Sequence, residues 1–485
     1  MQKEGPGLAE GDRRWIMGNL GKIEPEYRDS PIPLFQQVIA DDPVPAPAVL
    51  QEYSEVEVPV ARVPRAQYRS QEFAQLEIER MWPRTWQFAC REEQIPEVGD
   101  CLVYDSPVAS FILVRSADDE IRAFYNSCRH RGMKLCTHDT SVMKLSCPFH
   151  GFTWNLDGSL AHVPSRWDFP GMVDSEMNLP EARVARWQGF VFINQDSEAP
   201  PLETYLGHLP AHFADWSYED KYLATVIKKT IDANWKTCIE AFLESYHLAG
   251  IHAQALPFGG DASTQYDVWP DDPHVTRFME PTGVMSDQLP RALSEQEILN
   301  AALSVVFAGS EPPTLEDGVK ARHFMAAGMR AAMSEAEGRD YSGISDSEAA
   351  DAVQYSVFPN MVIFRSLGYP YVYRFLPVKG DPNRATYEFL IFKPKPTDGT
   401  PIPEVEFVNL GENDTFAGAG VLPPWHGEIY DQDVNGLRQC QAGMRDGGDA
   451  DIIYSAYQEV RIRHLHQTLD RYLSDDPHEA PGRSR

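Results

Sequence analysis

The stretch Asn234–Gln254, NWKTCIEAFLESYHLAGIHAQ, decides how the rest of the chain is interpreted. Large apolar residues recur in it at helical spacing and predict an amphipathic helix with one buried face: Trp235, Ile239, Phe242, Leu243 and Tyr246. A helix would place Glu240, Glu244 and His247 on one face, because they are four and three residues apart. A buried carboxylate is costly unless it is paired, hydrogen-bonded or close to a metal. The stretch therefore predicts a polar site inside an apolar surround.

Two histidines in this stretch indicate what the site holds. His247 and His252 are five residues apart, about 140° around an ideal helix. They can reach one ion only if the helix widens or ends between them, and Gly250 is a plausible stop. Two imidazoles with one added carboxylate would form the facial triad of non-haem Fe(II) oxygenases. The alternative is a buried helix with two hydrogen-bonded histidines.

Composition narrows the class of protein. Lys and Arg total 43 and Asp and Glu total 72 among 485 residues, a net charge of −29. This balance argues against nucleic acid as a partner, because phosphate binding requires a basic face. No apolar run is long enough to span a membrane, and MQKEGPGLAEGDRRW lacks the core of a secretion signal. Seven cysteines do not form a disulfide framework, so we expect a cytoplasmic protein.

The first part of the chain predicts an arm and a small β domain. Residues 1–55 are rich in proline and predict an extended arm, either a disordered tail or a segment that packs on a neighbouring subunit through its apolar residues: Trp15, Ile16, Leu34 and Phe35. Residues 56–200 begin with a helical segment, SQEFAQLEIERMW. Short alternating runs follow, among them CLVYD, ASFILVRS, IRAFYNS and GFVFIN. They predict a small antiparallel sandwich.

Residues 201–475 predict a second α+β unit. The strand-like ATVIKKTID leads into the histidine helix, and residues 289–353 read as a helical insert. Three strands of a broad antiparallel sheet follow: VFPNMVIFRS, YPYVYRFLPV and RATYEFLIFKP. A helical stretch over about 427–473 and a polar tail, 476–485, close the chain.

The most specific signal lies in two loops of the sandwich. Cys128-x-His130 and Cys147-x-x-His150 are separated by sixteen residues. Two thiolates and two imidazoles are the ligands of a Rieske [2Fe–2S] cluster, in which both histidines bind one iron. A zinc site with two cysteines and two histidines is the alternative, but zinc motifs usually pair like residues on each loop. A mixed pair on both loops favours the cluster.

These motifs carry a resemblance to a known family. Asn126–Gly132 and Cys147–Trp154 resemble the Rieske domain of the Rieske non-haem iron, ring-hydroxylating oxygenases. Asn234–Lys236, with Glu240, Glu244, His247 and His252, is similar to the catalytic motif of the large, or alpha, terminal oxygenase subunit of that family. The resemblance covers roughly residues 86–444. Phe149 stands where electron-transferring Rieske proteins often have a cysteine, which favours the oxygenase branch.

The resemblance implies a role for each motif residue. The cluster would be held by Cys128, His130, Cys147 and His150. The mononuclear iron would be held by His247, His252 and a carboxylate ahead of Gln441-Ala-Gly, for which Asp433 fits best and Asp431 is the alternative. Glu244 would be the catalytic bridging carboxylate, at a position where many members have Asp.

The implied fold is α+β, with a Rieske β-sandwich and a catalytic antiparallel sheet wrapped by helices, of the helix-grip kind. The implied activity is hydroxylation of an aromatic or polycyclic apolar substrate by O₂. Dihydroxylation is the favoured form of this reaction. Electrons would come from NAD(P)H through a ferredoxin or flavin reductase to a homotrimer, in which a cluster histidine of one subunit reaches Glu244 of the next. A β subunit is an open addition. The alternatives are a demethylating or side-chain-hydroxylating monooxygenase and an electron-transfer-only Rieske protein.

Two further features suggest binding surfaces. The cluster loops are locally basic, which would suit an acidic electron-transfer partner, or else the basic residues form internal salt bridges: Arg129, Arg131, Lys134 and Lys144. Met325, Met329 and Met333 recur every fourth residue beside Phe324 and Gly328. Adaptable methionines suit an irregular apolar ligand, so Met325 and Met329 are predicted to line a substrate pocket. An ordinary core stripe is the alternative.

Overall fold

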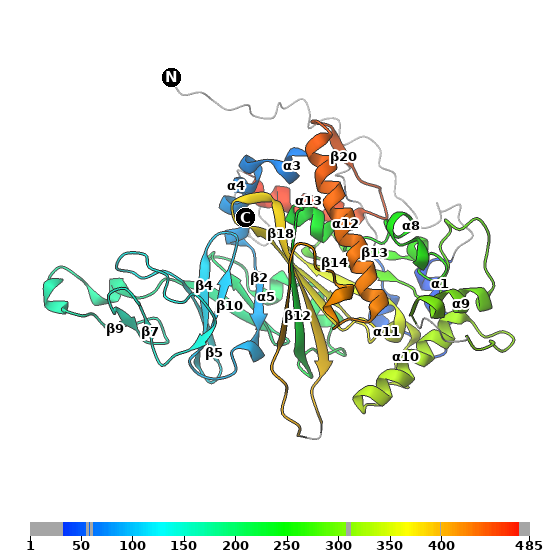
Figure 1. The fold of residues 1–485 in the computed structure, drawn as a ribbon, viewed down its shortest axis with the longest axis horizontal. Coiled ribbons are helices and arrows are strands. Elements are labelled where there is room, and N and C mark those ends of the chain that lie inside the picture. Colours follow the sequence, from blue (N-terminus) through cyan, green and yellow to red (C-terminus); the bar gives the residue numbers. More distant parts are fainter. Residues whose placement is uncertain (1–32, 55–57, 59–61, 307–311, 398, 475–485) are drawn as a thin grey trace.

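A computed structural model describes residues 33–54, 58, 62–306, 312–397 and 399–474. Figure 1 shows two modules side by side, a smaller β module (the sandwich module, strands β2–β11) and a larger one built around a long sheet (the large module). Trp15, Ile16 and the tail 476–485, on which predictions were made, lie outside the described residues. No helix among the described residues has both the length and the apolar character needed to cross a bilayer.

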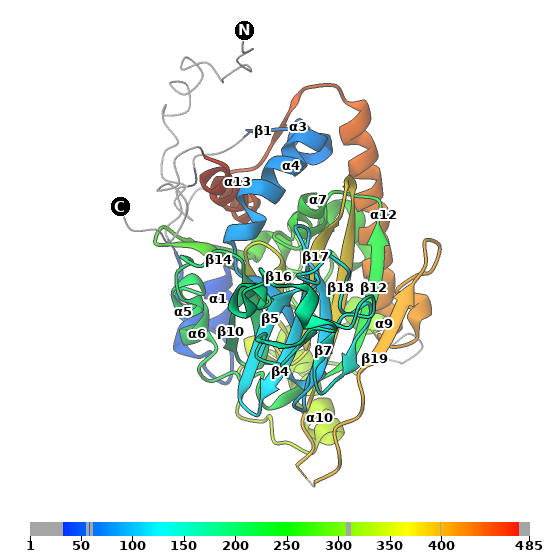
Figure 2. The ribbon, with the colours of Figure 1, turned by 90° about the vertical axis from the view of Figure 1, so that its left-hand side faces the viewer.

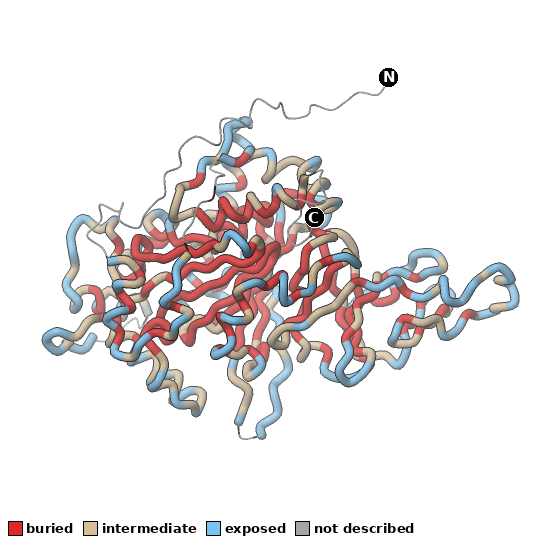
Figure 3. Tube along the Cα trace, turned by 180° about the vertical axis from the view of Figure 1, so that it is seen from behind, coloured by how far each residue is buried: buried red, intermediate tan, exposed pale blue. Residues whose placement is uncertain are grey.

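The sandwich module contains a seven-stranded antiparallel sheet in the order β2-β11-β10-β5-β4-β3-β6 and a three-stranded sheet, β7-β8-β9. Its strands are β2 Gln87–Arg91, β3 Asp100–Asp105, β4 Ser110–Ala117, β5 Glu120–Tyr125, β6 Thr140–Ser141, β7 Leu145–Ser146, β8 Thr153–Trp154, β9 Leu160–His162, β10 Glu181–Trp187 and β11 Phe190–Asn194. The small sheet projects at the far end of the molecule in Figure 1, and Figure 3 shows that this end is largely exposed. The predicted alternating runs are therefore present as strands.

The large module contains an eight-stranded sheet in the order β13-β14-β15-β16-β17-β18-β12-β19. Its strands are β12 Lys221–Ile231, β13 Gln265–Trp269, β14 Asp272–Glu280, β15 Ala352–Val357, β16 Met361–Phe364, β17 Tyr371–Val378, β18 Asp381–Pro394 and β19 Glu406–Leu410. All neighbours are antiparallel except β12 and β19, so the predicted antiparallel sheet is present and has one parallel pair at its edge. Strand β12 lies between β18 and β19 and is antiparallel to β18. Because the chain reverses direction between β18 and β19, β19 runs parallel to β12.

The large module also contains helices, some of which cover the two faces of its sheet. They are α5 Leu202–Tyr205, α6 Leu209–His212, α7 Trp235–Glu240, α8 Leu248–Ile251, α9 Glu295–Val306, α10 Ala321–Glu337, α11 Asp346–Ala350, α12 Pro424–Asp446 and α13 Val460–Leu473. Figure 2 shows α5 and α6 on one side of the sheet and α12 on the other. Side chains of β17 alternate accordingly, since Tyr371 and Tyr373 enter one core cluster and Val372 enters the other.

Two predicted elements are divided. The run VFPNMVIFRS is not one strand, because β15 ends at Val357 and a turn containing Pro359 precedes β16. Proline cannot donate to a strand ladder, which explains the interruption. The stretch 427–473 is not continuously helical either. Gly447 follows α12, Gly448 has a φ of +68°, and a short strand, β20 Asp451–Ile453, intervenes before α13.

The segment before the sandwich packs on the large module. It contains β1 Arg62–Pro64, α3 Ala66–Arg69 and α4 Gln71–Arg80, and β1 pairs with β20. Glu77 on α4 accepts hydrogen bonds from Lys236 Nζ at 2.5 Å and from the Trp235 indole at 3.1 Å. The leading helix therefore contacts the histidine stretch rather than serving the sandwich alone.

The described part of the N-terminal arm is also held by this chain. It forms α1 Phe35–Ile39 and α2 Ala48–Gln51. Phe35 is buried in the same core cluster as Trp86 and Phe190, and Gln36 donates to Gln265 at 2.8 Å. The prediction that Phe35 packs on a neighbouring subunit is therefore wrong, because its apolar surface is already covered within its own chain.

Candidate metal centres

The predicted single helix over 234–254 is wrong. Helix α7 begins after Asn234, whose side chain accepts from the Lys236 amide, and ends at Glu240. The short α8 and a 3-10 turn, Ala253–Ala255, follow after a non-helical segment. Both histidines thus lie beyond the break, and Gly250 lies inside α8 rather than stopping a helix.

The break turns side chains away from the directions that a continuous helix would impose. Tyr246 is 50% exposed and does not belong to a buried stripe. Glu240 accepts from Tyr68 Oη at 2.7 Å and Tyr454 Oη at 3.1 Å and contacts His466 Nε2 at 2.9 Å, in a separate buried network. The prediction that Glu240 shares a face with Glu244 and His247 is therefore wrong.

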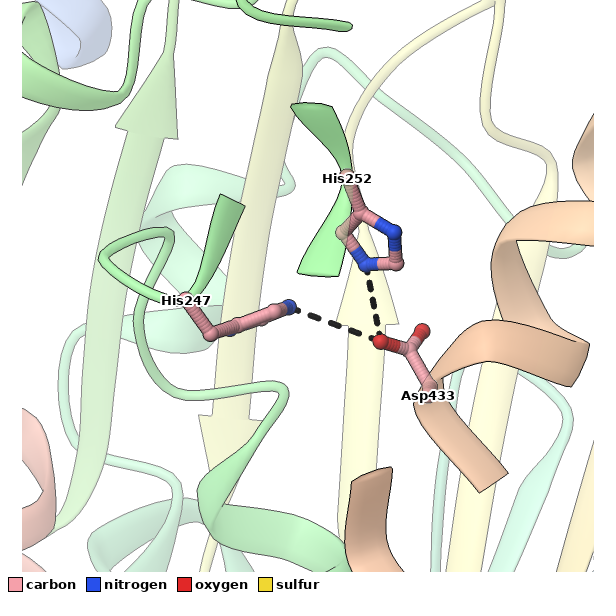
Figure 4. A group of neighbouring side chains, drawn as sticks. All are labelled: His247, His252 and Asp433. Atoms are coloured by element: carbon pink, nitrogen blue, oxygen red, sulfur yellow. Dashed lines mark hydrogen bonds and ion pairs between the residues drawn. The ribbon is translucent and has the colours of Figure 1, made fainter. Parts of the chain in front are cut away.

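His247, His252 and Asp433 converge on one point (Figure 4). Oδ1 of Asp433 lies 2.8 Å from His252 Nε2 and 3.5 Å from His247 Nε2. Burial would raise the pKa of Asp433, but its hydrogen bonds to the two histidines outweigh burial and hold the pKa at about 2. The ligand atoms of the two imidazoles and the carboxylate all lie within 4.8 Å of one another. This group fits the donor set of a non-haem iron(II) ion.

Each imidazole is held through its other ring nitrogen. Nδ1 of His247 lies 2.8 Å from Glu244 Oε1, and the other Glu244 oxygen accepts the His247 amide at 2.9 Å. Nδ1 of His252 lies 2.8 Å from Oε1 of Gln432, which also accepts from Gln254. Such contacts fix the ring orientation and the tautomer. Gln432 was not predicted, although its place beside Asp433 was the available signal.

Asp431, the alternative ligand, is directed elsewhere. Its carboxylate accepts the Phe416 amide at 2.7 Å and the Ala417 amide at 3.1 Å. Residues two apart on α12 point to nearly opposite sides of a helix. Asp431 and Asp433 therefore cannot both face the histidines, and the helix presents Asp433.

The two cysteine–histidine loops have the same backbone design. The Gly132 amide donates to Cys128 O at 2.9 Å, and the Gly151 amide donates to Cys147 O at 3.0 Å. Both glycines have φ near +75°, which favours glycine. Each cysteine amide also donates to the carbonyl five residues later. The matching turns hold the two cysteines in equivalent positions, whereas His130 follows its cysteine by two residues and His150 by three.

The four side chains of these loops lie together. The rings of His130 and His150 are 4.8 Å apart, and both cysteines are buried. Burial and the adjacent Cys147 thiol raise the pKa of Cys128 despite hydrogen bonds from backbone amides. Nδ1 of His130 is buried and has no hydrogen-bond partner among the described residues. A metal bound there would satisfy this nitrogen, so the group fits a [2Fe–2S] cluster.

A cavity of about 630 Å³ opens onto the histidine–carboxylate group. Met325 and Met329 both line it, as do Phe324, Gly328 and Met333 of α10. The predicted placement of the two methionines beside the iron ligands therefore agrees with the geometry. Met329 and Met333 also pack against a core cluster, so the stripe serves both purposes.

Several cavity residues were not predicted. Phe364, Tyr371 and Tyr373 reach the cavity from β16 and β17, and alternation along those strands was the signal that would have found them. Glu280, the last residue of β14, also lines the cavity, and nothing in the local sequence indicated it.

The basic residues of the cluster loops have unequal surroundings. Lys134 pairs with Asp105 at 3.2 Å, Arg129 donates to Glu176 O at 2.9 Å, and Arg131 lies 5.5 Å from the Phe149 ring centre. Lys144 is exposed and forms no ion pair within the described ranges. Lys134 is therefore paired within the chain, whereas the Lys144 ammonium group remains available to contact another protein.

The class of protein follows from two features. One is the pair of loops that each offer a cysteine and a histidine, and the other is the group of two histidines and one carboxylate beside a helix-flanked sheet. Together they define a class of proteins with two iron centres. The family description "Ring hydroxylating alpha subunit (catalytic domain)" matches residues 209–475, and "Rieske [2Fe-2S] domain" matches residues 85–172. Because the first match spans more than half of the chain, the chain belongs to the ring-hydroxylating alpha-subunit family. The predicted family and fold class are confirmed.

Similar proteins include members with different reactions. The chain is 34% identical over 209 residues to the biphenyl 2,3-dioxygenase subunit alpha of Rhodococcus jostii (strain RHA1), over 40% of this chain and 45% of that protein. It is 30% identical over 193 residues to the carnitine monooxygenase oxygenase subunit of Escherichia coli (strain K12), over 39% of this chain and 52% of that protein. The matches thus span about half the length of these relatives. A structure of naphthalene 1,2-dioxygenase with indole has a TM-score of 0.60 at 19% identity, covering 86% of this chain and 94% of that one, and shares the fold.

Proposed function

We propose that this chain is the terminal oxygenase component of a multicomponent Rieske non-haem iron oxygenase. It would hydroxylate an aromatic or polycyclic apolar substrate with O₂ and electrons derived from NAD(P)H. The form of hydroxylation that we favour is dihydroxylation. The observation that carries the proposal is the cavity of about 630 Å³, which is rich in apolar and aromatic side chains and opens onto His247, His252 and Asp433. A protein that only transfers electrons would need no such cavity.

The proposal assigns each centre to residues of this chain. Cys128, His130, Cys147 and His150 would hold a [2Fe–2S] cluster, and His247, His252 and Asp433 would hold iron(II). When bound, the two centres supply single electrons and a site for O₂ activation. Glu244 and Gln432 orient the two imidazoles, while the aromatic walls exclude water and position the substrate next to the ligand group.

Electron supply would involve other proteins and other copies of this chain. In Figure 1 the sheet that carries the second cluster loop and helix α8 lie at opposite ends of the molecule. This separation supports a head-to-tail homotrimer, with or without a β subunit, in which the cluster of one subunit faces Glu244 of the next. A ferredoxin or flavin reductase would deliver electrons to the cluster loops, at Arg129, Arg131, Lys134 and Lys144.

The proposed domain division is an arm (1–55), a Rieske domain with its leading helix (56–200) and a catalytic domain (201–475) with a helical insert (289–353). All seven cysteines are free, which supports a reducing, cytoplasmic location.

A second candidate function is monooxygenation, either demethylation or side-chain hydroxylation. The similarity to a carnitine monooxygenase favours this candidate, whereas the similarity to a biphenyl dioxygenase favours dihydroxylation. The ligand group is compatible with both reactions.

Product analysis under ¹⁸O₂ tests the proposal. Protein reconstituted anaerobically with iron and sulfide, and supplied with a surrogate ferredoxin and reductase, would be given a panel that includes biphenyl and naphthalene. Two labelled oxygens per product indicate dihydroxylation, and one indicates monooxygenation. His208→Ala is the matched control for His247→Ala, because the partly exposed His208 lies outside both the cavity lining and the ligand group. Absence of acid-labile sulfide, or full turnover by His247→Ala, would overturn the proposal.

A further inference from the structure

One acidic side chain stands out in the cavity. Glu280 ends β14 and lines the cavity together with Phe278, Phe258 and Tyr369. Its Oε1 lies beside Gly259, 3.4 Å from the position that a Cβ would occupy there. No hydrogen bond or ion pair joins the Glu280 carboxyl to another residue in the described part of the chain. A carboxyl group in an apolar cavity normally has such a partner.

The surroundings of Glu280 are acidic and lack a free cation. The residues that line the cavity include no lysine or arginine. Arg322, which lies behind the cavity wall, is already paired with Asp42 at 2.9 Å and with Asp351 at 3.0 Å. Burial, and then nearby Asp261, Asp351 and Glu244, raise the pKa of Glu280 to about 8, although His247 opposes the shift. A pKa near 8 leaves the carboxyl group mostly protonated at pH 7, and a ligand that brings a positive charge would favour its ionised form.

Charge balance at the proposed iron site leaves Glu280 unaccounted for. An iron(II) ion would more than offset the single charge of Asp433, and the carboxylate of Glu244, which contacts His247, would balance the remainder. His426 is the remaining imidazole of the cavity, and burial lowers its pKa to about 3, so it is neutral. No protein group of the cavity lining is therefore available to balance the charge that Glu280 carries when it is ionised.

The walls beside Glu280 suit a positively charged group with an apolar body. Tyr369, Phe258 and Phe278 present aromatic rings to the same cavity, and ring faces attract cations as well as hydrocarbon surfaces. Burial, and then the charge of Glu280, raise the pKa of Tyr369, which places the carboxyl near this ring.

We propose that Glu280 is a specificity-determining residue that selects substrates in which an aromatic or alicyclic body carries a protonated amine. The carboxylate binds the ammonium group, and the aromatic and methionine walls enclose the rest of the molecule. This inference rests on the proposed oxygenase function, because it defines the substrate class for the same cavity.

The test compares three ligands of similar shape: indane, 2-indanol and 2-aminoindane. Binding is measured by isothermal titration calorimetry with the metal-loaded protein under anaerobic conditions without reductant, so that no turnover is needed. We expect 2-aminoindane to bind at least about tenfold more tightly than indane, because a charge-assisted hydrogen bond is added. We expect 2-indanol to bind less tightly than the amine.

Two variants localise the effect. Glu280→Gln keeps the shape but removes the charge, and it should weaken 2-aminoindane binding about tenfold while leaving indane almost unchanged. Glu335→Gln is the matched control, because Glu335 is an exposed residue of α10 outside the cavity lining. It should change both affinities by less than about twofold, since exposed charges are screened.

Equal binding of amine and hydrocarbon by the wild-type protein would overturn the inference, even if Glu280→Gln failed to fold. Tighter binding of 2-indanol than of the amine, or an amine preference retained by Glu280→Gln, would also overturn it. If the amine binds through Glu280 but neither the amine nor any hydrocarbon of the panel acquires ¹⁸O, the oxygenase proposal fails and the binding site stands. If hydrocarbons are oxygenated and Glu280 has no effect on binding, the oxygenase proposal stands and the inference about Glu280 fails.

Discussion

The two candidate metal centres are built in different ways. The four candidate cluster ligands come from two short loops within a span of 23 residues, and each loop closes on itself through the same backbone hydrogen bonds. The candidate iron ligands come from two separate parts of the chain, because His252 and Asp433 are 181 residues apart. The cluster loops lie at an exposed end of the molecule, whereas Asp433 and His252 are buried. A local centre depends on loop geometry, and a composite centre depends on the packing of the whole module.

The largest expected effect is loss of the composite centre through Asp433→Asn. The variant should lose mononuclear iron and reduce turnover by more than the roughly 100-fold that an orienting residue typically contributes. Asp431→Asn is the matched control, because that carboxylate accepts two backbone amides instead, and it should cost less than about 1 kcal/mol of stability. Iron analysis and acid-labile sulfide would be measured together.

The converse substitution, Cys147→Ser, should remove sulfide and the visible absorption of the cluster while mononuclear iron remains. Loss of both centres in either variant would show that the two sites are not independent, and the contrast drawn above would be incorrect.

The second expected effect separates two glutamates of the histidine stretch. Glu244→Gln should lower turnover about 10- to 100-fold, because the Glu244 carboxylate orients His247. Glu240→Gln should instead lower the free energy of unfolding by about 1–3 kcal/mol, because it disturbs the buried network with Tyr68, Tyr454 and His466. Turnover at saturating substrate and urea unfolding distinguish the two. Equal behaviour of the variants would contradict the observed break after α7.

A third prediction concerns acid. Burial, then the charges of Arg471 and Arg461, lower the pKa of His464 in the large module to about 4. The unfolded chain, in which a histidine titrates near 6.5, therefore binds more protons between these values. Stability is full above pH 6.5 and falls as the pH decreases, by about 2 kcal/mol at pH 5 for this residue.

The free energy of unfolding should differ less between pH 7 and pH 5 in His464→Gln than in the wild-type protein, because the contribution of His464 is removed. An unchanged dependence of the unfolding free energy on pH in His464→Gln would contradict the prediction.

The smallest expected effect is on electron delivery. Lys134→Glu combined with Lys144→Glu should slow reduction by an acidic ferredoxin about tenfold at low salt, and the difference should disappear at high salt. Lys393→Glu combined with Lys395→Glu changes the net charge equally at the end of β18, away from the cluster loops, and serves as the control. Stopped-flow reduction across a salt series makes the measurement. A rate unaffected by the first pair would exclude docking at these residues.

The sequence alone determined the features that depend on short spacings. The candidate cluster ligands, the two candidate iron histidines and the alternating strands could all be predicted, because each is encoded within one loop or a few turns of chain. Only the tertiary structure decided that α7 ends before the histidines, that α12 presents Asp433 rather than Asp431, and that Gln432 holds His252. It also placed Glu280 of β14 in the cavity beside α10. These relations join segments far apart in sequence, and packing of the sheet against its helices, not local periodicity, sets which side chains meet.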